Sequence, residues 1–170
     1  RGRYSVVTVR EIEQDADVER LTKMPGIGGV AMISRLLVPP DLQTDRELRI
    51  AASKIHADML LLYSFDVVFR VDRHDIGPLG VITLGMLPNR EAKVTSTCAA
   101  ALFDVRTGFI YGAAEATADV KQRANAWNNR EAVDRSRLEA QRKSFEKLLP
   151  EVERMWAGVA STYGNATAAK

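Results

Sequence analysis

The stretch AALFDVRTGFIYGAAEAT, residues 100–117, decides the fold. Two strand-like runs, 92–105 and 109–120, flank an Arg-Thr-Gly connection at 106–108. A three-residue connection that ends in glycine suits a type I turn followed by a left-handed residue, which closes a β-hairpin. Asp104 is placed to accept hydrogen bonds from the N–H groups of this turn. A nucleophile at Asp104 would need a base and an orienting partner, and the adjacent residues supply neither. The sequence therefore predicts a hairpin here.

A long helix is predicted after the hairpin, from about residue 129. Its apolar stripe consists of Val133, Leu138, Phe145, Leu148, Leu149, Val152, Met155, Trp156 and Val159. The many alanines of the hairpin, with Gly112, are small enough to let this helix pack close to the sheet. Pro150 interrupts the stripe, so we expect a kink or a restart there. Basic and acidic residues alternate on the rest of the helix, which is typical of a solvated face.

The first part of the chain alternates between strand and helix patterns. We expect a short strand at 4–10, a helix at 13–24 that ends before a Pro-Gly pair, and a buried strand at 30–40. A second helix is predicted at 44–56, because Thr44 and Glu47 have the spacing of a capping box. Its apolar face consists of Leu48, Ala51, Ala52 and Ile55.

A long strand is predicted at 58–72. Its first residues, Met59 to Leu62, are continuously apolar, as in a strand covered on both faces. From Tyr63 onward apolar and polar residues alternate, apart from Val68, which indicates a half-exposed strand. Asp66 and Arg70 share the polar side, and we expect a weak ion pair between them.

These elements predict an α/β (α+β) fold: a single domain with a mixed sheet, a hairpin, helices mainly on one face and a long kinked C-terminal helix. The domain is expected to span residues 1–163, followed by a disordered tail at 164–170. Hydrophobic residues make up 46% of the 170 residues and charged residues 27%, which is ordinary for a globular protein. The net charge of +2 gives no electrostatic reason to expect nucleic acid or an acidic membrane surface.

No residue pattern predicts catalysis, a cofactor or a metal. The glycine-rich run at 24–30 lacks the pattern of a phosphate-binding loop. His56 and His74, the only histidines, lack further ligands at suitable spacing. Cys98, the only cysteine, is interpreted as a small strand residue.

The apolar insert at 76–89 is the strongest candidate for a partner surface. It either completes the core as a strand or short helix, or is an exposed loop that contacts a partner. In the second case the partner surface consists of Leu79, Val81, Ile82, Leu84, Met86 and Leu87.

Three passages, LLVPPDL (36–42), ADMLLLYSFD (57–66) and ALFDVRTGFIYGAAEAT (101–117), together resemble a known family. Their order across residues 30–118 resembles the rhombosortase-associated (rhombotail) bacterial envelope lipoproteins and, more distantly, lipoproteins of the curli-secretion type. The resemblance implies a periplasmic protein anchored by a lipidated cysteine at the mature N-terminus, which the given residues do not contain. It supplies no catalytic residues.

Two hypotheses of different classes follow. The first is a non-enzymatic envelope lipoprotein domain that scaffolds or binds a protein partner, touches the membrane only through its N-terminal lipid, and binds neither cofactor nor nucleic acid. The second is a small enzyme or ligand-binding domain whose site assembles only in three dimensions, around Asp66, Asp104 and His74. A stress-related cytoplasmic protein with no link to a membrane is a third interpretation.

Overall fold

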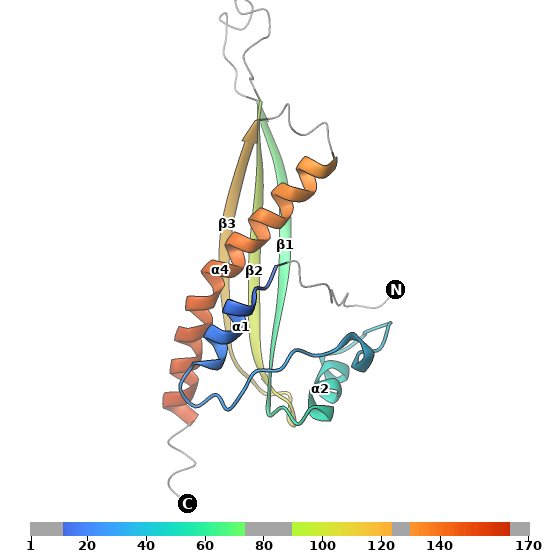
Figure 1. The fold of residues 1–170 in the computed structure, drawn as a ribbon, viewed down its shortest axis with the longest axis vertical. Coiled ribbons are helices and arrows are strands. Elements are labelled where there is room, and N and C mark those ends of the chain that lie inside the picture. The colour runs from blue at the N-terminus through green and yellow to red at the C-terminus, as the bar shows by residue number, and fades with distance from the viewer. Residues whose placement is uncertain (1–11, 74–89, 124–129, 164–170) are drawn as a thin grey trace, which may run out of the picture.

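The computed structural model describes residues 12–73, 90–123 and 130–163. Three predictions lie outside these residues: the strand at 4–10, the apolar insert at 76–89 and the tail at 164–170. The elements follow one another in the order α1 (Asp15–Thr22), η1 (Arg35–Leu37), α2 (Asp45–Lys54), β1 (Met59–Arg73), β2 (Arg90–Asp104), β3 (Ile110–Arg123) and α4 (Arg130–Tyr163) (Figure 1).

The three strands form one sheet in the order β1-β2-β3, and both pairings are antiparallel. The predicted α/β single-domain class is confirmed, with α4 lying diagonally across one face of the sheet (Figure 1). The predicted long strand at 58–72 is confirmed as β1. Its register pairs Tyr63 with Ala100 and Phe65 with Cys98, so these residues share a face of the sheet.

The predicted hairpin is confirmed. Gly108 has φ 77°, the left-handed conformation that the connection requires, and its N–H donates to Asp104 O at 2.9 Å. The Asp104 carboxylate accepts from Thr107 N at 2.6 Å and from Thr107 Oγ1 at 2.8 Å. The hydrogen bond from the Thr107 N–H is the main reason why the pKa of Asp104 lies below its ordinary value. Asp104 therefore fixes the turn.

The long C-terminal helix packs its apolar stripe on the alanine-rich face of the sheet. Phe145, Leu148, Leu149 and Val152 are buried with Cys98 and Ala100. The approach is close at Gly112, where an added Cβ would lie 2.8 Å from Met155 Cγ. Lys147 Nζ also reaches the sheet and donates to Thr117 O at 3.1 Å.

The helix continues through Pro150 as one element, so of the two predicted alternatives, a kink or a restart, the restart does not occur. Proline removes one backbone hydrogen bond of the helix. Leu149 and Val152, on either side of it, are both buried against the sheet. This packing keeps the two halves of α4 in one continuous helix.

The second helix and its flanking loop form a separate cluster at one end of the sheet. The predicted capping box is confirmed, and Thr44 N donates to Glu47 Oε2 at 3.1 Å. The predicted apolar face is confirmed as well, with Ala51 and Ala52 fully buried. The other members of the cluster come from α2, from β1 and β2, and from the loops that flank them. Val38, Leu42, Leu48, Leu60 and Val105 are buried, and Ile33, Leu37, Ala57, Leu62 and Phe103 pack against them.

The strand predicted at 30–40 is wrong. The segment has no strand partner among the described residues, and a single 3-10 turn, η1, occupies 35–37. Ser34 Oγ caps this turn by accepting from Leu36 N at 3.3 Å. Val38 is buried, whereas Leu36 is 94% exposed. A few apolar residues of this segment therefore pack into the α2 cluster, and the segment does not form a buried strand.

The first helix, predicted at 13–24, is confirmed at 15–22 and lies against α4 (Figure 1). A partly buried ion pair joins the two: Arg142 contacts both carboxylate oxygens of Asp17, and its second nitrogen lies 3.2 Å from Oδ1. Arg142 also donates to Ile12 O at 2.9 Å. One arginine thus fixes α1, and the segment that precedes it, on α4.

Candidate functional site

The two faces of the sheet differ because alternate residues of each strand point to opposite sides. On β2, Val94, Ser96, Cys98 and Ala100 face α4 and are buried. The buried polar member is satisfied, since Ser96 Oγ and Ser144 Oγ of α4 lie 3.0 Å apart. The residues between them point away from α4. The α2 cluster covers this second face near the hairpin turn, and no described helix covers the rest of it.

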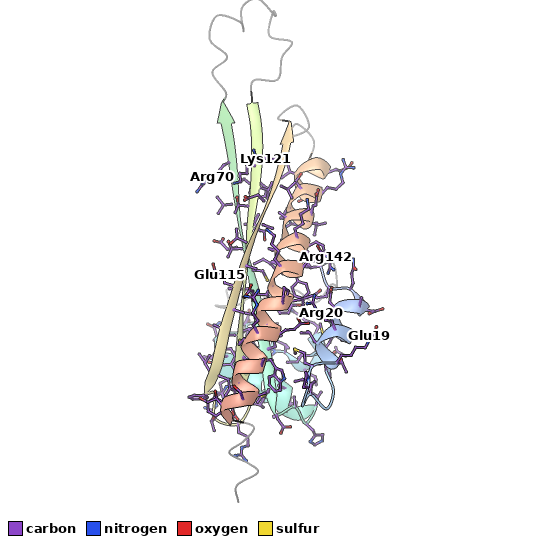
Figure 2. All side chains as sticks on the ribbon, turned by 90° about the vertical axis from the view of Figure 1, so that its left-hand side faces the viewer. Glu19, Arg20, Arg70, Glu115, Lys121 and Arg142 are labelled. Carbon is purple, nitrogen blue, oxygen red and sulfur yellow. The ribbon has the colours of Figure 1, made fainter. Side chains whose placement is uncertain are left out.

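We call this uncovered surface the open face. It consists of Ser64, Asp66, Val68 and Arg70 of β1, Lys93, Thr95, Thr97 and Ala99 of β2, and Glu115, Thr117, Asp119 and Lys121 of β3. Viewed from the β3 edge, Arg70 and Glu115 lie on the side of the sheet opposite α4, whereas Arg142 and Arg20 lie on the helical side (Figure 2). The open face is thus polar and accessible.

Side chains of the open face are held by bonds between neighbouring strands. Thr97 Oγ1 and Thr117 Oγ1 lie 3.0 Å apart, and Thr95 Oγ1 donates to Asp119 Oδ1 at 2.7 Å. Lys93 Nζ lies 2.9 Å from Asp119 Oδ2. The hydrogen bond from Lys93, followed by that from Thr95, lowers the pKa of Asp119 below its ordinary value. The middle of the open face is therefore an ordered polar surface.

Charged residues of the open face lie in rows across the three strands. The register aligns Arg70, Lys93 and Lys121 in one row, and the next row away from the hairpin turn consists of Asp72, Glu91 and Arg123. On the other side of the basic row, toward the hairpin turn, the charged residues are Asp119, Asp66 and Glu115. The basic row therefore has acidic residues on both sides of it.

The expected Asp66–Arg70 ion pair is wrong, because the described residues contain no such pair. Four residues of extended strand separate their Cα atoms by about 13 Å, which is beyond the reach of the two side chains. Their shared face was predicted correctly, but the spacing of four is a helical contact and not a strand contact.

The second hypothesis grouped Asp66, Asp104 and His74, and the structure does not bring the two aspartates together. Asp66 is opposite Thr97, while Asp104 is opposite Met59, seven positions further along β1. That separation is about 23 Å along the strand. His74 lies outside the described residues, as do Leu79, Val81, Ile82, Leu84, Met86 and Leu87, which the sequence proposed as a partner surface. His56, the other histidine, is exposed.

Cys98 is a buried strand residue, as predicted. It is fully buried between the sheet and α4, and burial raises the pKa of its thiol to about 12. Thiol reagents attack the thiolate, so neither access nor ionisation favours reaction in the folded protein.

We expect the thiol of Cys98 to react with a thiol-specific chromogenic reagent at pH 8 at least about a hundredfold more slowly in the native protein than in 6 M guanidinium chloride. The reason is that burial in the native protein keeps the reagent away from the thiol. Absorbance against time measures both rates. Equal rates would show that the core around Cys98 opens freely.

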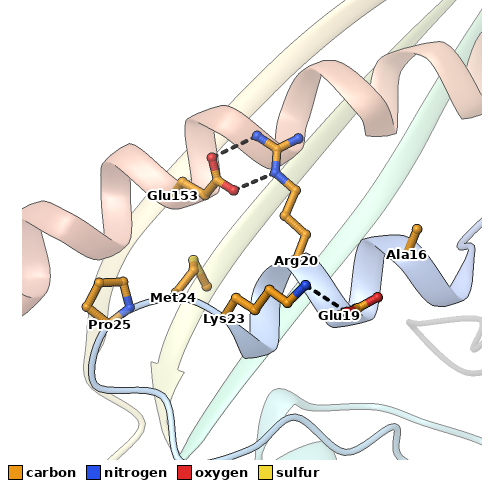
Figure 3. Close-up of a pocket in the computed structure, with 7 residues that line it drawn as sticks. All are labelled: Ala16, Glu19, Arg20, Lys23, Met24, Pro25 and Glu153. Atoms are coloured by element: carbon orange, nitrogen blue, oxygen red, sulfur yellow. Dashed lines mark hydrogen bonds and ion pairs between the residues drawn. The ribbon is translucent and has the colours of Figure 1, made fainter.

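A cleft of about 460 Å³ lies between α1 and α4 (Figure 3). Its charged residues are paired with one another: Arg20 Nη2 lies 2.8 Å from Glu153 Oε2, and Lys23 Nζ lies 2.7 Å from Glu19 Oε1. The hydrogen bond from Arg20 is the main cause that lowers the pKa of Glu153. The remaining lining residues are Ala16, Met24 and Pro25. The pairing across the cleft supports the docking of α1.

Within the described ranges no cluster of three or more His, Cys, Asp or Glu side chains is arranged to hold a metal ion. In the same part of the chain, no helix combines the length and apolar character needed to cross a membrane.

The sequence did not predict that polar residues of the three strands form one surface, the open face. The alternation of Thr95 and Thr97 with buried residues was a usable signal for β2, and Glu115, Thr117 and Asp119 alternate likewise on β3. Only the register shows that these residues lie side by side with Asp66 and Arg70. Searches against known proteins add no assignment: no protein-family model, curated protein or solved structure matches the chain.

Proposed function

We propose that this chain is a non-enzymatic, partner-binding domain of a bacterial envelope lipoprotein, and that the open face contacts the partner. The observation that carries the proposal is the asymmetry of the sheet, which buries one face under α4 and presents the other. The open face spreads side chains over three strands, a broad surface that suits a protein partner, whereas small ligands favour concave pockets.

The bonds within the open face support a binding role. Thr97, Thr117 and Asp119 are already held by neighbouring side chains before any partner arrives. Binding by ordered groups loses less conformational entropy than binding by free ones. The envelope location rests on the resemblance of residues 30–118 to rhombotail lipoproteins.

Substitution of the open face tests partner binding. Thr97→Arg, which places a long charged side chain in the middle of the face, is expected to reduce the partner recovered with the tagged protein by at least about tenfold. Thr22→Arg is the matched control, because Thr22 is exposed on α1 on the other side of the molecule. Quantitative mass spectrometry of material cross-linked in cells measures both. Equal recovery from the two variants would contradict the proposed surface.

The envelope location needs its own test on the full-length precursor. Cells expressing it are fractionated, and the intact mass of the membrane-associated form is determined. A lipid-sized mass increment on a cysteine upstream of Arg1 is expected. Unmodified protein in the cytosol would contradict the lipoprotein assignment and leave the open face as a binding surface in another compartment.

A further inference from the structure

We infer that two copies of this chain dimerise through the outer edge of β1, with the two β1 strands paired antiparallel, so that the two three-stranded sheets become one continuous sheet. The inference goes beyond the proposed function, because it concerns the edge of the sheet and not the open face. Its basis is the exposure and the sequence of β1, which fit a second copy of the same strand.

The outer edge of β1 is uncovered beyond the α2 cluster. β1 pairs with β2 on one side, and no strand of the described residues lies on its other side. α4 packs mainly on β3 and β2. The α2 cluster lies beside β1 only near Leu60 and Leu62, at the end close to the hairpin turn (Figure 1). The backbone groups along the rest of this edge are therefore placed to pair with a further strand.

β1 lacks the features that prevent pairing at a sheet edge. Proteins protect such edges with prolines, lysines and β-bulges. The 15 residues of β1 include neither proline nor lysine, and they pair with β2 in one unbroken register. Val68 and Phe69 point to opposite faces of the sheet, yet they are 41% and 42% exposed. A strand added beside β1 would cover both side chains.

The sequence of β1 is complementary to itself about Val68. A two-fold axis perpendicular to the sheet at this residue places Val68 opposite its own copy. The same axis places Val67 opposite Phe69 and Asp66 opposite Arg70. Aromatic residues opposite β-branched ones, and opposite charges, stabilise antiparallel pairs. Asp66 and Arg70 are about 13 Å apart along one strand, so they meet only across two copies.

The charges of β1 also disfavour neighbouring registers. An axis at Phe69 would bring Asp66 opposite Asp72, and an axis at Asp66 would bring it opposite itself. An axis at Val67 leaves Asp66 and Arg70 opposite uncharged residues. With the axis at Val68, Asp72 is opposite Ser64, so no like charges face each other. Because the axis is perpendicular to the sheet, the two open faces lie on the same side of the dimer and form one wider surface.

Disulfide formation between copies tests the position of the axis. In Val68→Cys the two new thiols are opposite each other, where Cα atoms of an antiparallel pair lie about 4.5–5.5 Å apart, within the range of a disulfide. Ser64→Cys is the matched control on the same face, because its two copies are about 26 Å apart. The native Cys98 is buried and does not compete. Under mild oxidation, non-reducing electrophoresis should show that Val68→Cys cross-links at least about tenfold faster than Ser64→Cys. Equal rates would overturn the inference.

Charge reversal tests the dimer without a cross-link, by sedimentation velocity of the purified chain over a range of concentrations. Asp66→Arg and Arg70→Asp are each expected to weaken the dimer by at least about tenfold, because each brings like charges together at two symmetric positions. Both residues are exposed, so neither substitution disturbs the core.

A mixture of the two variants distinguishes the paired strands from a general effect of charge. Asp66→Arg mixed with Arg70→Asp restores opposite charges at both positions, so a heterodimer of about wild-type affinity is expected. Thr22→Arg, on α1, should leave the dimer unchanged. A mixture that stays monomeric, or a wild type that is monomeric at every concentration, would refute the dimer and leave the proposed role of the open face as it stands.

Discussion

Leu148→Ala is expected to lower the free energy of unfolding by about 3 kcal/mol, as measured by urea denaturation. Leu148 is 1% exposed and packs with Phe145, Cys98 and Ala100 where α4 meets the sheet. Removal of its side chain leaves a cavity, because the alanines opposite it are too small to fill the space. The loss combines the transfer of the apolar side chain with the unfilled volume.

Leu36→Ala is the matched control, since the same chemical change occurs where the side chain is 94% exposed. Its effect is expected to stay within about 0.5 kcal/mol. If Leu148→Ala lowered the free energy of unfolding by no more than Leu36→Ala, the result would contradict the packing of α4 on the alanine-rich face.

Arg142→Met is expected to lower the free energy of unfolding by about 2–3 kcal/mol. The variant keeps much of the aliphatic stem but leaves the Asp17 carboxylate, whose side chain is 9% exposed, without its counter-charge. It also removes the hydrogen bond to Ile12 O. Urea denaturation near pH 7 measures the loss.

Lys143→Met is the neighbouring control on α4. The pair of Lys143 with Glu139 has both side chains about half exposed, so its loss is expected to cost less than about 0.5 kcal/mol. Similar losses for Arg142→Met and Lys143→Met would show that the contact between α1 and α4 adds nothing to stability.

The Asp17–Arg142 contact should also depend on pH. Burial by itself would raise the pKa of Asp17, but the hydrogen bonds from Arg142 and Gln14 N, with the charges of Arg142 and Arg20, outweigh it and hold the pKa below 3.8. A carboxylate with a lowered pKa in the folded state contributes stability above its unfolded pKa. That contribution is lost as the pH falls from about 4 through the folded pKa. The difference between wild type and Asp17→Asn should shrink over this window, and a constant difference would contradict the ion-pair account.

The elements that depend on local sequence could be predicted. The turn at 106–108 follows from Gly108 and Asp104, and the start of α2 follows from Thr44 and Glu47, because these groups act on backbone atoms within a few residues. The apolar stripe of α4 could be predicted because the geometry of a helix fixes the spacing of the residues on one face.

Features that depend on contacts between distant residues could not be predicted. Arg142 was interpreted as part of a solvated face, although it forms a partly buried ion pair with Asp17, 125 positions away in the sequence. The segment at 30–40 has the composition of a strand, but composition does not supply a neighbouring strand. The open face needs the register of three strands, which no single segment encodes.

Site-specific photo-cross-linking in cells tests most directly whether the open face contacts a partner. A photoreactive residue at Thr117, on the open face, is compared with one at Ala157, which is exposed on α4. The account predicts light-dependent protein adducts from position 117 and none above background from position 157. Adducts from position 157 alone, or none from position 117 when the protein is present at equal levels, would contradict it.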